Sequence, residues 1–108
     1  MKKIHIALST SDINGSVDDY SRRMDSEPVV VVPNQYALWR TESVNLSIRQ
    51  DNSVPSGQLR HLGWEEPGVS SFTESVDVNG ITWESFTAEQ QADEINEFWP
   101  ESKYSVSS

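Results

Sequence analysis

Residues 3–24 read KIHIALSTSDINGSVDDYSRRM, and the spacing of their apolar side chains changes partway along. Over residues 3–9 apolar and polar side chains alternate, which is typical of a strand with one buried face. The two faces carry Ile4, Ile6 and Leu8 on one side and His5, Ala7 and Ser9 on the other. After the candidate N-caps Ser11 and Asp12 the apolar spacing becomes helical, through Ile13, Val17, Tyr20 and Met24. The region therefore predicts a strand followed by a helix that ends near Met24.

Strands are also predicted after this helix. Residues 28–32 are rich in β-branched side chains and end at the turn pair Pro33-Asn34, and residues 36–41 and 44–50 follow. A polar linker over residues 51–58 separates them from Leu59–Glu65, which has a strand pattern and contains His61. At 108 residues the chain is long enough for one ordinary domain. We expect an α+β domain over residues 1–108, made of a βαβββ unit (1–50), the linker (51–58) and a shortened second unit (59–108).

Two structures are compatible with the segment around Asn79-Gly80. This pair suits a type I′ turn and favours a hairpin over residues 76–83. The same residues would also suit a helix over 70–79 that uses Gly80 as its left-handed terminal residue. A further helix is predicted after the candidate capping box Thr87-Ala88-Glu89-Gln90, and it should end at Pro100.

The charge of the chain is unevenly distributed. The net charge is −9; residues 1–60 carry seven basic and seven acidic side chains, and residues 61–108 carry Lys103 against ten acidic ones. An acidic surface repels phosphate backbones, so we expect no nucleic-acid partner. The same field would attract a cationic ligand.

Several kinds of site and location are disfavoured by composition. The absence of cysteine excludes disulfides, thiolate metal sites and cysteine nucleophiles. No apolar run approaches the roughly 18 residues of a membrane span, so no membrane partner is expected. Met1-Lys2-Lys3 leads into an alternating strand pattern and not into the apolar core of a signal peptide, so we expect a cytoplasmic protein.

Short motifs along the first 65 residues occur in an order known from one superfamily. They are His5-Ile6-Ala7-Leu8, Asp12-Ile13, Ser16-Val17 with Tyr20-Ser21, Glu27-Pro28-Val29, Tyr36-Ala37 and Leu59-Arg60-His61-Leu62-Gly63. In these motifs the chain resembles the vicinal oxygen chelate superfamily of glyoxalases, bleomycin-resistance proteins and extradiol dioxygenases. The nearest branch is that of the cadmium-induced and organoarsenical-lyase-like proteins. The resemblance implies paired βαβββ modules that form a cupped mixed sheet around a divalent metal ion, here with a degenerate second module.

The resemblance also implies which residues would hold the metal. His5 and His61 are the only histidines and match the ligand positions of the first strand of each module, while Gln50 is a candidate neutral ligand. The strand 44–50 departs from the family because its inferred cup face carries no carboxylate. A carboxylate from the C-terminal third would have to complete the set, with Glu94, Glu97 and Glu101 as candidates. The paired cysteines of the organoarsenical lyases are absent, which excludes that activity.

Two functions follow as hypotheses. The first is binding of a small aromatic or cationic molecule in the cup without turnover, through Trp39, Asn45, Ser47 and Arg49. The alternative is a metal-dependent lyase, isomerase or dioxygenase of the vicinal oxygen chelate type, with His5 and His61 as ligands. The sequence leaves open whether the protein is an enzyme. We also expect a homodimer, because a shortened second unit leaves sheet edge and cup surface for a second copy to cover.

Overall fold

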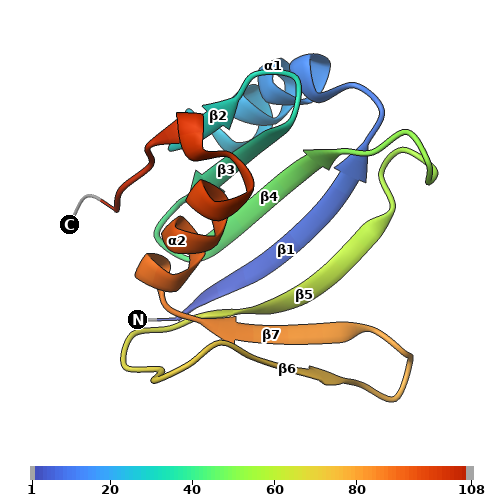
Figure 1. Cartoon of the computed structure of the whole chain (residues 1–108). Coiled ribbons are helices and arrows are strands. Elements are labelled where there is room, and N and C mark those ends of the chain that lie inside the picture. The colour runs from blue at the N-terminus through green and yellow to red at the C-terminus, as the bar shows by residue number, and fades with distance from the viewer. Residues whose placement is uncertain (1, 107–108) are drawn as a thin grey trace.

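The protein has an α+β fold built on one mixed sheet, as the sequence predicts (Figure 1). The structure is a computed structural model and describes residues 2–106. The strands are β1 (Lys3–Thr10), β2 (Val30–Val32), β3 (Tyr36–Arg40), β4 (Val44–Gln50), β5 (Leu59–Glu65), β6 (Thr73–Val76) and β7 (Thr82–Phe86). They lie in the order β2-β3-β4-β1-β5-β7-β6. The pairs β1–β4 and β5–β7 are parallel and the other neighbours are antiparallel.

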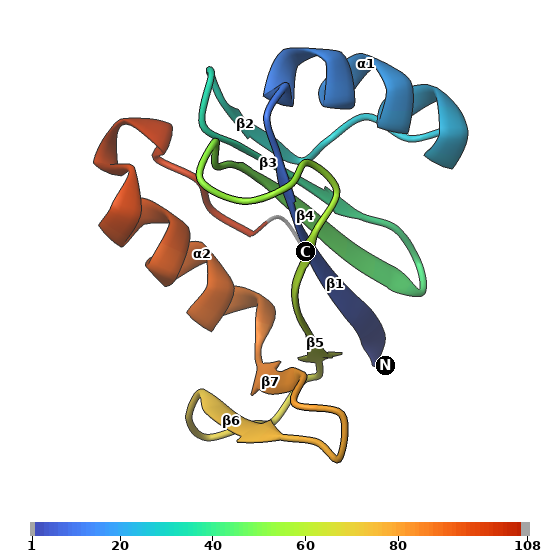
Figure 2. The same ribbon diagram turned by 90° about the vertical axis from the view of Figure 1, so that its right-hand side faces the viewer.

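Two α-helices pack on opposite sides of this sheet, as Figure 2 shows. Helix α1 (Ile13–Met24) covers one side, where Ile13 packs with Ala37, Trp39, Leu46 and Ile48. Helix α2 (Ala88–Phe98) covers part of the other side, where Ile95 packs with Val32, Tyr36 and Leu38. A short 3-10 helix, η1 (Pro100–Ser102), follows α2. Within residues 2–106, neither α-helix has the length and apolar composition that crossing a bilayer requires.

The helix ends follow the local signals in the sequence. Asp12 caps α1 by accepting a hydrogen bond from the backbone N–H of Gly15, and α2 begins with the predicted capping box of Thr87 and Gln90. Around Asn79-Gly80 the hairpin alternative is confirmed and the helix over 70–79 is wrong, because β6 and β7 pair antiparallel on either side of the turn. Asp77 accepts backbone hydrogen bonds from Asn79 and Ile81, which stabilises the turn.

The strand β5 is irregular beside β1. Ala7 pairs with His61 and Leu8 pairs with Leu59, so Arg60 is an extra residue in a β-bulge. A bulge redirects a side chain that strict alternation would place on the opposite face. Arg60 consequently faces the same cavity as His61, on the α2 side of the sheet.

Candidate functional site

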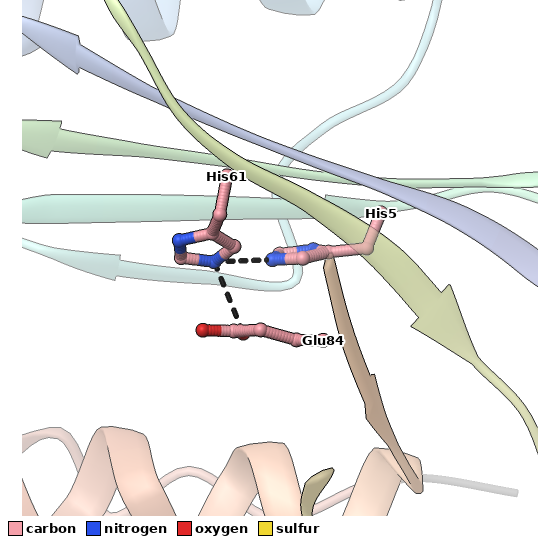
Figure 3. Close-up of side chains that lie close together, drawn as sticks. All are labelled: His5, His61 and Glu84. Atoms are coloured by element: carbon pink, nitrogen blue, oxygen red, sulfur yellow. Dashed lines mark hydrogen bonds and ion pairs between the residues drawn. The ribbon is translucent and has the colours of Figure 1, made fainter. Parts of the chain in front are cut away.

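The structure brings the two histidines together on the α2 side of the sheet. His5 lies on β1 and His61 on β5, and these strands are antiparallel neighbours. The Nε2 atoms of the two rings lie 3.0 Å apart (Figure 3). His5 is only 3% exposed, whereas His61 is half-buried. The alternation of residues 3–9 correctly placed His5 on a shared face with Ala7 and Ser9.

A carboxylate completes this group, and it comes from β7. Glu84 Oε1 lies 3.1 Å from His61 Nε2, and one ligand atom from each of the three side chains lies within 4.8 Å of the others. Figure 3 shows Glu84 and His5 both directed at the same nitrogen of His61. The group could hold a metal ion, because neutral imidazole and carboxylate are both good metal ligands. We call His5, His61 and Glu84 the triad.

Gly63 allows β7 to approach β5 closely enough to bring Glu84 into the triad. Gly63 pairs with Glu84 in the parallel β5–β7 ladder. A Cβ atom at Gly63 would clash with the backbone carbonyl of Glu84 and lie 3.0 Å from its backbone nitrogen. A side chain at this position would therefore push the two strands apart.

A buried network of hydrogen bonds holds the triad residue His5 on the side away from His61. Arg40 donates two hydrogen bonds to Glu65, of 2.7 and 2.9 Å, and Asn45 Nδ2 donates to Glu65 Oε1 at 2.8 Å. Asn45 Oδ1 lies 2.8 Å from His5 Nδ1. Gln91 of α2 exchanges two further hydrogen bonds with the Asn45 amide. Asn45 is fully buried, and its side chain has a partner for both N–H groups and two for its oxygen.

The hydrogen bonds of Asn45 fix the tautomer of His5. Because the Glu65 carboxylate is ionised and can only accept, the nitrogen of the Asn45 amide must face it. The oxygen of Asn45 therefore faces His5, so His5 Nδ1 carries a hydrogen and donates it. The lone pair of the ring is then on Nε2, the atom that faces His61. Metal-ligating histidines commonly donate their second ring N–H in this way.

Burial keeps the His5 ring neutral. It lowers the pKa of His5 from 6.5 to about 4; the hydrogen bond to Asn45 opposes the shift and the charge of His61 adds to it. Burial also disfavours ionisation of Glu65, but its bonds to Arg40 and Asn45 outweigh that effect and lower its pKa. At neutral pH the site therefore contains a neutral His5 and an ionised Glu65 behind Asn45.

The triad lines a cavity of about 220 Å³ between the sheet and α2. Its wall also contains Tyr36, Arg49, Arg60, Phe72, Phe98 and Trp99. The volume is below the roughly 300–1,000 Å³ that is usual for drug-sized ligands, so the cavity suits a smaller molecule.

Of the residues predicted to contact a ligand, Ser47 and Arg49 line the cavity and Trp39 and Asn45 do not. The prediction for Trp39 is wrong: the side chain is fully buried on the α1 side, and its Nε1 donates to Ser21 Oγ. Both faces of β3 are covered by helices, so alternation identified no open face there. Asn45 lies on the α2 side of the sheet, as predicted, but it contacts His5 and does not line the cavity.

The prediction of Gln50 as a metal ligand is also wrong. Its Oε1 accepts a hydrogen bond from the backbone N–H of Ile13, and its Nε2 donates to Asn52. Gln50 therefore supports the start of α1, and it pairs with Thr10 at the far end of β1 from His5. Alternation along β4 already places Gln50 with Leu46 and Ile48, on the face opposite Asn45.

Sequence reasoning missed two residues of the site. Glu84 was not among the candidate carboxylates, of which only Glu94 lines the cavity. Glu84 could have been found by assuming that β7 pairs parallel with β5, but no local pattern indicates this. Arg60 was not among the candidate site residues, because strict alternation places it opposite His61 and a bulge leaves no clear signal in the sequence.

Comparison with known proteins establishes the fold alone. No family model and no curated protein matches the chain. Among solved structures, one chain described as an NAD-dependent benzaldehyde dehydrogenase from Legionella pneumophila superposes with a TM-score of 0.55 at 12% sequence identity. The match covers 78% of this chain and 97% of that chain.

Proposed function

We propose that the protein binds a divalent transition-metal ion through the triad and presents it to a small molecule in the adjoining cavity. One observation carries this proposal. His61 Nε2 faces two acceptors, the bare Nε2 of His5 at 3.0 Å and Glu84 Oε1 at 3.1 Å. Nε2 of His61 can carry only one hydrogen, which cannot form a straight hydrogen bond to both. A cation among the three atoms would satisfy all of them at once.

The donor set favours particular metals. Two imidazoles and one carboxylate suit zinc, iron(II), nickel or copper better than calcium or magnesium, which prefer oxygen ligands. Donors bound to zinc at about 2.0–2.1 Å lie roughly 3.4 Å apart in a tetrahedral site. The observed separations of 3.0 and 3.1 Å are close to that value. Three protein ligands would leave a coordination position for a substrate oxygen.

We further propose that the chain is a member of the vicinal oxygen chelate superfamily with two βαβββ-derived units. The proposal is supported by the ordered motifs of the first 65 residues, and by histidines on β1 and β5 that face one cavity. A metal in such a site acts as a Lewis acid towards substrate oxygens. In this chain Asn45 orients His5, Gly63 admits Glu84, and α2 forms one wall of the cavity. The reaction would be of the lyase, isomerase or dioxygenase type.

Binding without turnover is the second candidate, and the aromatic wall of the cavity favours it. Phe72 and Phe98 are 41% and 55% exposed at the cavity, and Trp99 stacks on Tyr36 with a centroid distance of 4.8 Å. A cationic ligand was expected to stack on an indole ring. In the structure, however, the cation over the indole ring of Trp99 is the side chain of Arg49. The guanidinium carbon of Arg49 lies 5.1 Å from the ring centre of Phe98 and 5.5 Å from that of Trp99.

The metal proposal is tested by the metal content of protein purified without chelators, and by calorimetric titration with zinc and cobalt. We expect one ion per chain, and a cobalt absorption spectrum typical of nitrogen and oxygen ligands. His5→Ala, His61→Ala and Glu84→Gln should each lower zinc affinity at least about 100-fold, more than the 10–100-fold typical of outer-shell changes. The matched control is Glu74→Gln on the neighbouring exposed strand β6, which pairs with Glu84.

Wild-type protein that binds no zinc or cobalt would contradict the metal proposal. So would a Glu84→Gln variant that binds them as tightly as Glu74→Gln does. A metal-free protein that still binds small aromatic molecules, detected by tryptophan fluorescence, would support the second candidate in its place.

The expected homodimer stays a proposal. Strands β2 and β6 are the two edges of the sheet, and Val76, at the end of β6, and Val78 beyond it are exposed apolar side chains. Such edges are sites at which a second copy can add. Sedimentation equilibrium tests this, and a monomer mass at all concentrations would exclude it.

A further inference from the structure

Two arginines face the cavity beside the triad. Arg49 lies near the end of β4, and Arg60 is the bulged residue of β5, next to His61. Both side chains are half-buried and both line the cavity. Two positively charged groups therefore lie at the wall of one partly buried cavity, which costs free energy unless an anion joins them.

Neither guanidinium has a carboxylate partner in the part of the chain that the structure describes. Arg22 and Arg23 each pair with Asp19, and Arg40 pairs with Glu65. No Asp or Glu oxygen of residues 2–106 lies within 4.0 Å of the guanidinium nitrogens of Arg49 or Arg60. The two arginines that face the cavity thus differ from the other three in the protein.

The surroundings of Arg49 leave its hydrogen-bond donors available. Its guanidinium lies over the rings of Phe98 and Trp99. Stacking uses the face of the guanidinium, whereas its N–H groups point outward in its plane. Arg49 is therefore held in place by aromatic contacts while its donors can still bind an oxyanion.

We propose that the cavity binds a small aromatic carboxylate, whose carboxylate group lies between Arg49 and Arg60 and whose ring contacts the aromatic wall. Guanidinium groups bind carboxylates through paired, charge-assisted hydrogen bonds. Phe72 and the exposed part of Phe98 supply apolar surface for the ring, and about 220 Å³ limits the ligand to roughly one ring. This reverses the cationic ligand expected from the net charge, because two arginines without carboxylate partners line the cavity although the chain as a whole is acidic.

The inference rests on the proposed function only in placing an oxygen-bearing substituent of the ligand near the triad. Two acidic side chains of the same cavity oppose carboxylate binding, Glu84 of the triad and Glu94 of α2. Replacing Glu94 by glutamine removes a negative charge from the cavity wall and should strengthen carboxylate binding.

Three probes of one shape test the charge preference: benzoate, neutral benzamide and cationic benzamidinium. Their binding is measured by calorimetry on zinc-loaded protein and on chelator-treated protein. We expect benzoate to bind at least about tenfold more tightly than benzamide, and benzamidinium to bind most weakly. Arg49→Gln and Arg60→Gln should each weaken benzoate binding about 10–100-fold. Arg22→Gln, on the exposed surface of α1, is the matched control.

The outcomes separate this inference from the metal proposal. Zinc binding with no benzoate binding, with equal binding of all three probes, or with the tightest binding for benzamidinium would overturn the inference alone. Benzoate binding that Arg60→Gln leaves unchanged would also overturn it. Arginine-dependent benzoate binding to a protein that binds no metal would support the inference and contradict the metal proposal. A thermal midpoint of Arg60→Gln close to that of wild-type protein shows that the variant is folded.

Discussion

Asn45 is the residue that connects the buried polar groups of the site by hydrogen bonds. Its amide contacts Glu65, Gln91 and His5, which come from β5, α2 and β1. A leucine would fill the same space, but His5 Nδ1 and the Gln91 amide would lose their partner, and Glu65 would keep only its hydrogen bonds from Arg40. The residue therefore has two roles: it satisfies buried polar groups, and it orients His5 towards the triad.

Removing the Asn45 amide should affect both stability and metal binding. Asn45→Ala leaves buried polar groups unpaired, so we expect the free energy of unfolding to fall by about 2–4 kcal/mol. Zinc affinity should fall about 10–100-fold, because His5 loses the partner that orients it. Urea denaturation and calorimetric titration measure the two effects. Asn14→Ala, which removes one exposed hydrogen bond to Asn34, should change neither; an Asn45→Ala variant that behaves like it would contradict this account.

The buried His5 should make stability depend on pH. Below about pH 6.5 the unfolded chain protonates this ring, whereas the folded protein keeps it neutral until about pH 4. The unfolded state then binds more protons, so the free energy of unfolding decreases as the pH falls through this window. The complete shift corresponds to about 3 kcal/mol.

Urea denaturation of chelator-treated protein between pH 5 and pH 7 measures this effect. The free energy of unfolding should be largest near pH 7 and decline towards pH 5, and His5→Gln should make the decline shallower. The same slope in wild-type protein and in His5→Gln would show that another group is responsible.

The pairing of β5 with β7 is the contact between elements on which the triad depends. His61 and Glu84 belong to strands that are separated in the sequence by β6 and its flanking loops, yet these strands are parallel neighbours. Gly63 makes that approach possible. The turn at Gly80 sets the register of the hairpin, and with it the position at which Glu84 meets β5.

A methyl group at Gly63 should separate the two strands. Gly63→Ala is expected to lower the free energy of unfolding by about 1–3 kcal/mol, because the clash is with backbone. It should also weaken zinc binding by moving Glu84 away from His61. Gly68→Ala is the control: Gly68 has a positive φ of 84° but open space around it, so some stability is lost and zinc affinity is kept. Equal zinc affinities for the two variants would contradict the role given to Gly63.

The triad joins parts of the chain that are far apart in the sequence. Its members lie near the N-terminus, after the linker and in the C-terminal third, and a ligand bound to all three would link β1, β5 and β7. Such a ligand binds the folded state and not the unfolded chain, so it adds stability by mass action. The fold and the proposed metal site should therefore be thermodynamically coupled.

Adding and removing metal should shift the thermal midpoint. At a free zinc concentration of 100 times the dissociation constant, the stabilisation is about 2.7 kcal/mol. For a domain of this length this corresponds to a rise in Tm of roughly 10 °C. Calorimetric scans with zinc and with chelator measure the difference. Glu84→Gln should abolish most of it, and a wild-type Tm that zinc leaves unchanged would argue against the coupling.

Local patterns predicted most of the elements, and two of the three triad residues, His5 and His61, were already candidates in the sequence. The change of period near residue 10 placed β1 and α1, and Asn79-Gly80 and Thr87–Gln90 marked the hairpin and the start of α2. The alternation on β1 put His5 on the right face. Alternation cannot identify an open face at Trp39, because helices cover both faces of β3, whereas along β4 it puts Gln50 on the face opposite Asn45.

Strand boundaries, helix caps and the facing of His5 follow from residues that are close in sequence, since hydrogen-bonding period and capping are local properties. Glu84 and Arg60 entered the site through strand pairing and a bulge, which depend on how distant segments pack against each other. The cavity wall likewise combines two arginines of the first 60 residues with two glutamates of the acidic C-terminal half. Folding gathered Arg49 and Arg60 on one wall, and no composition of the linear chain specifies such a grouping.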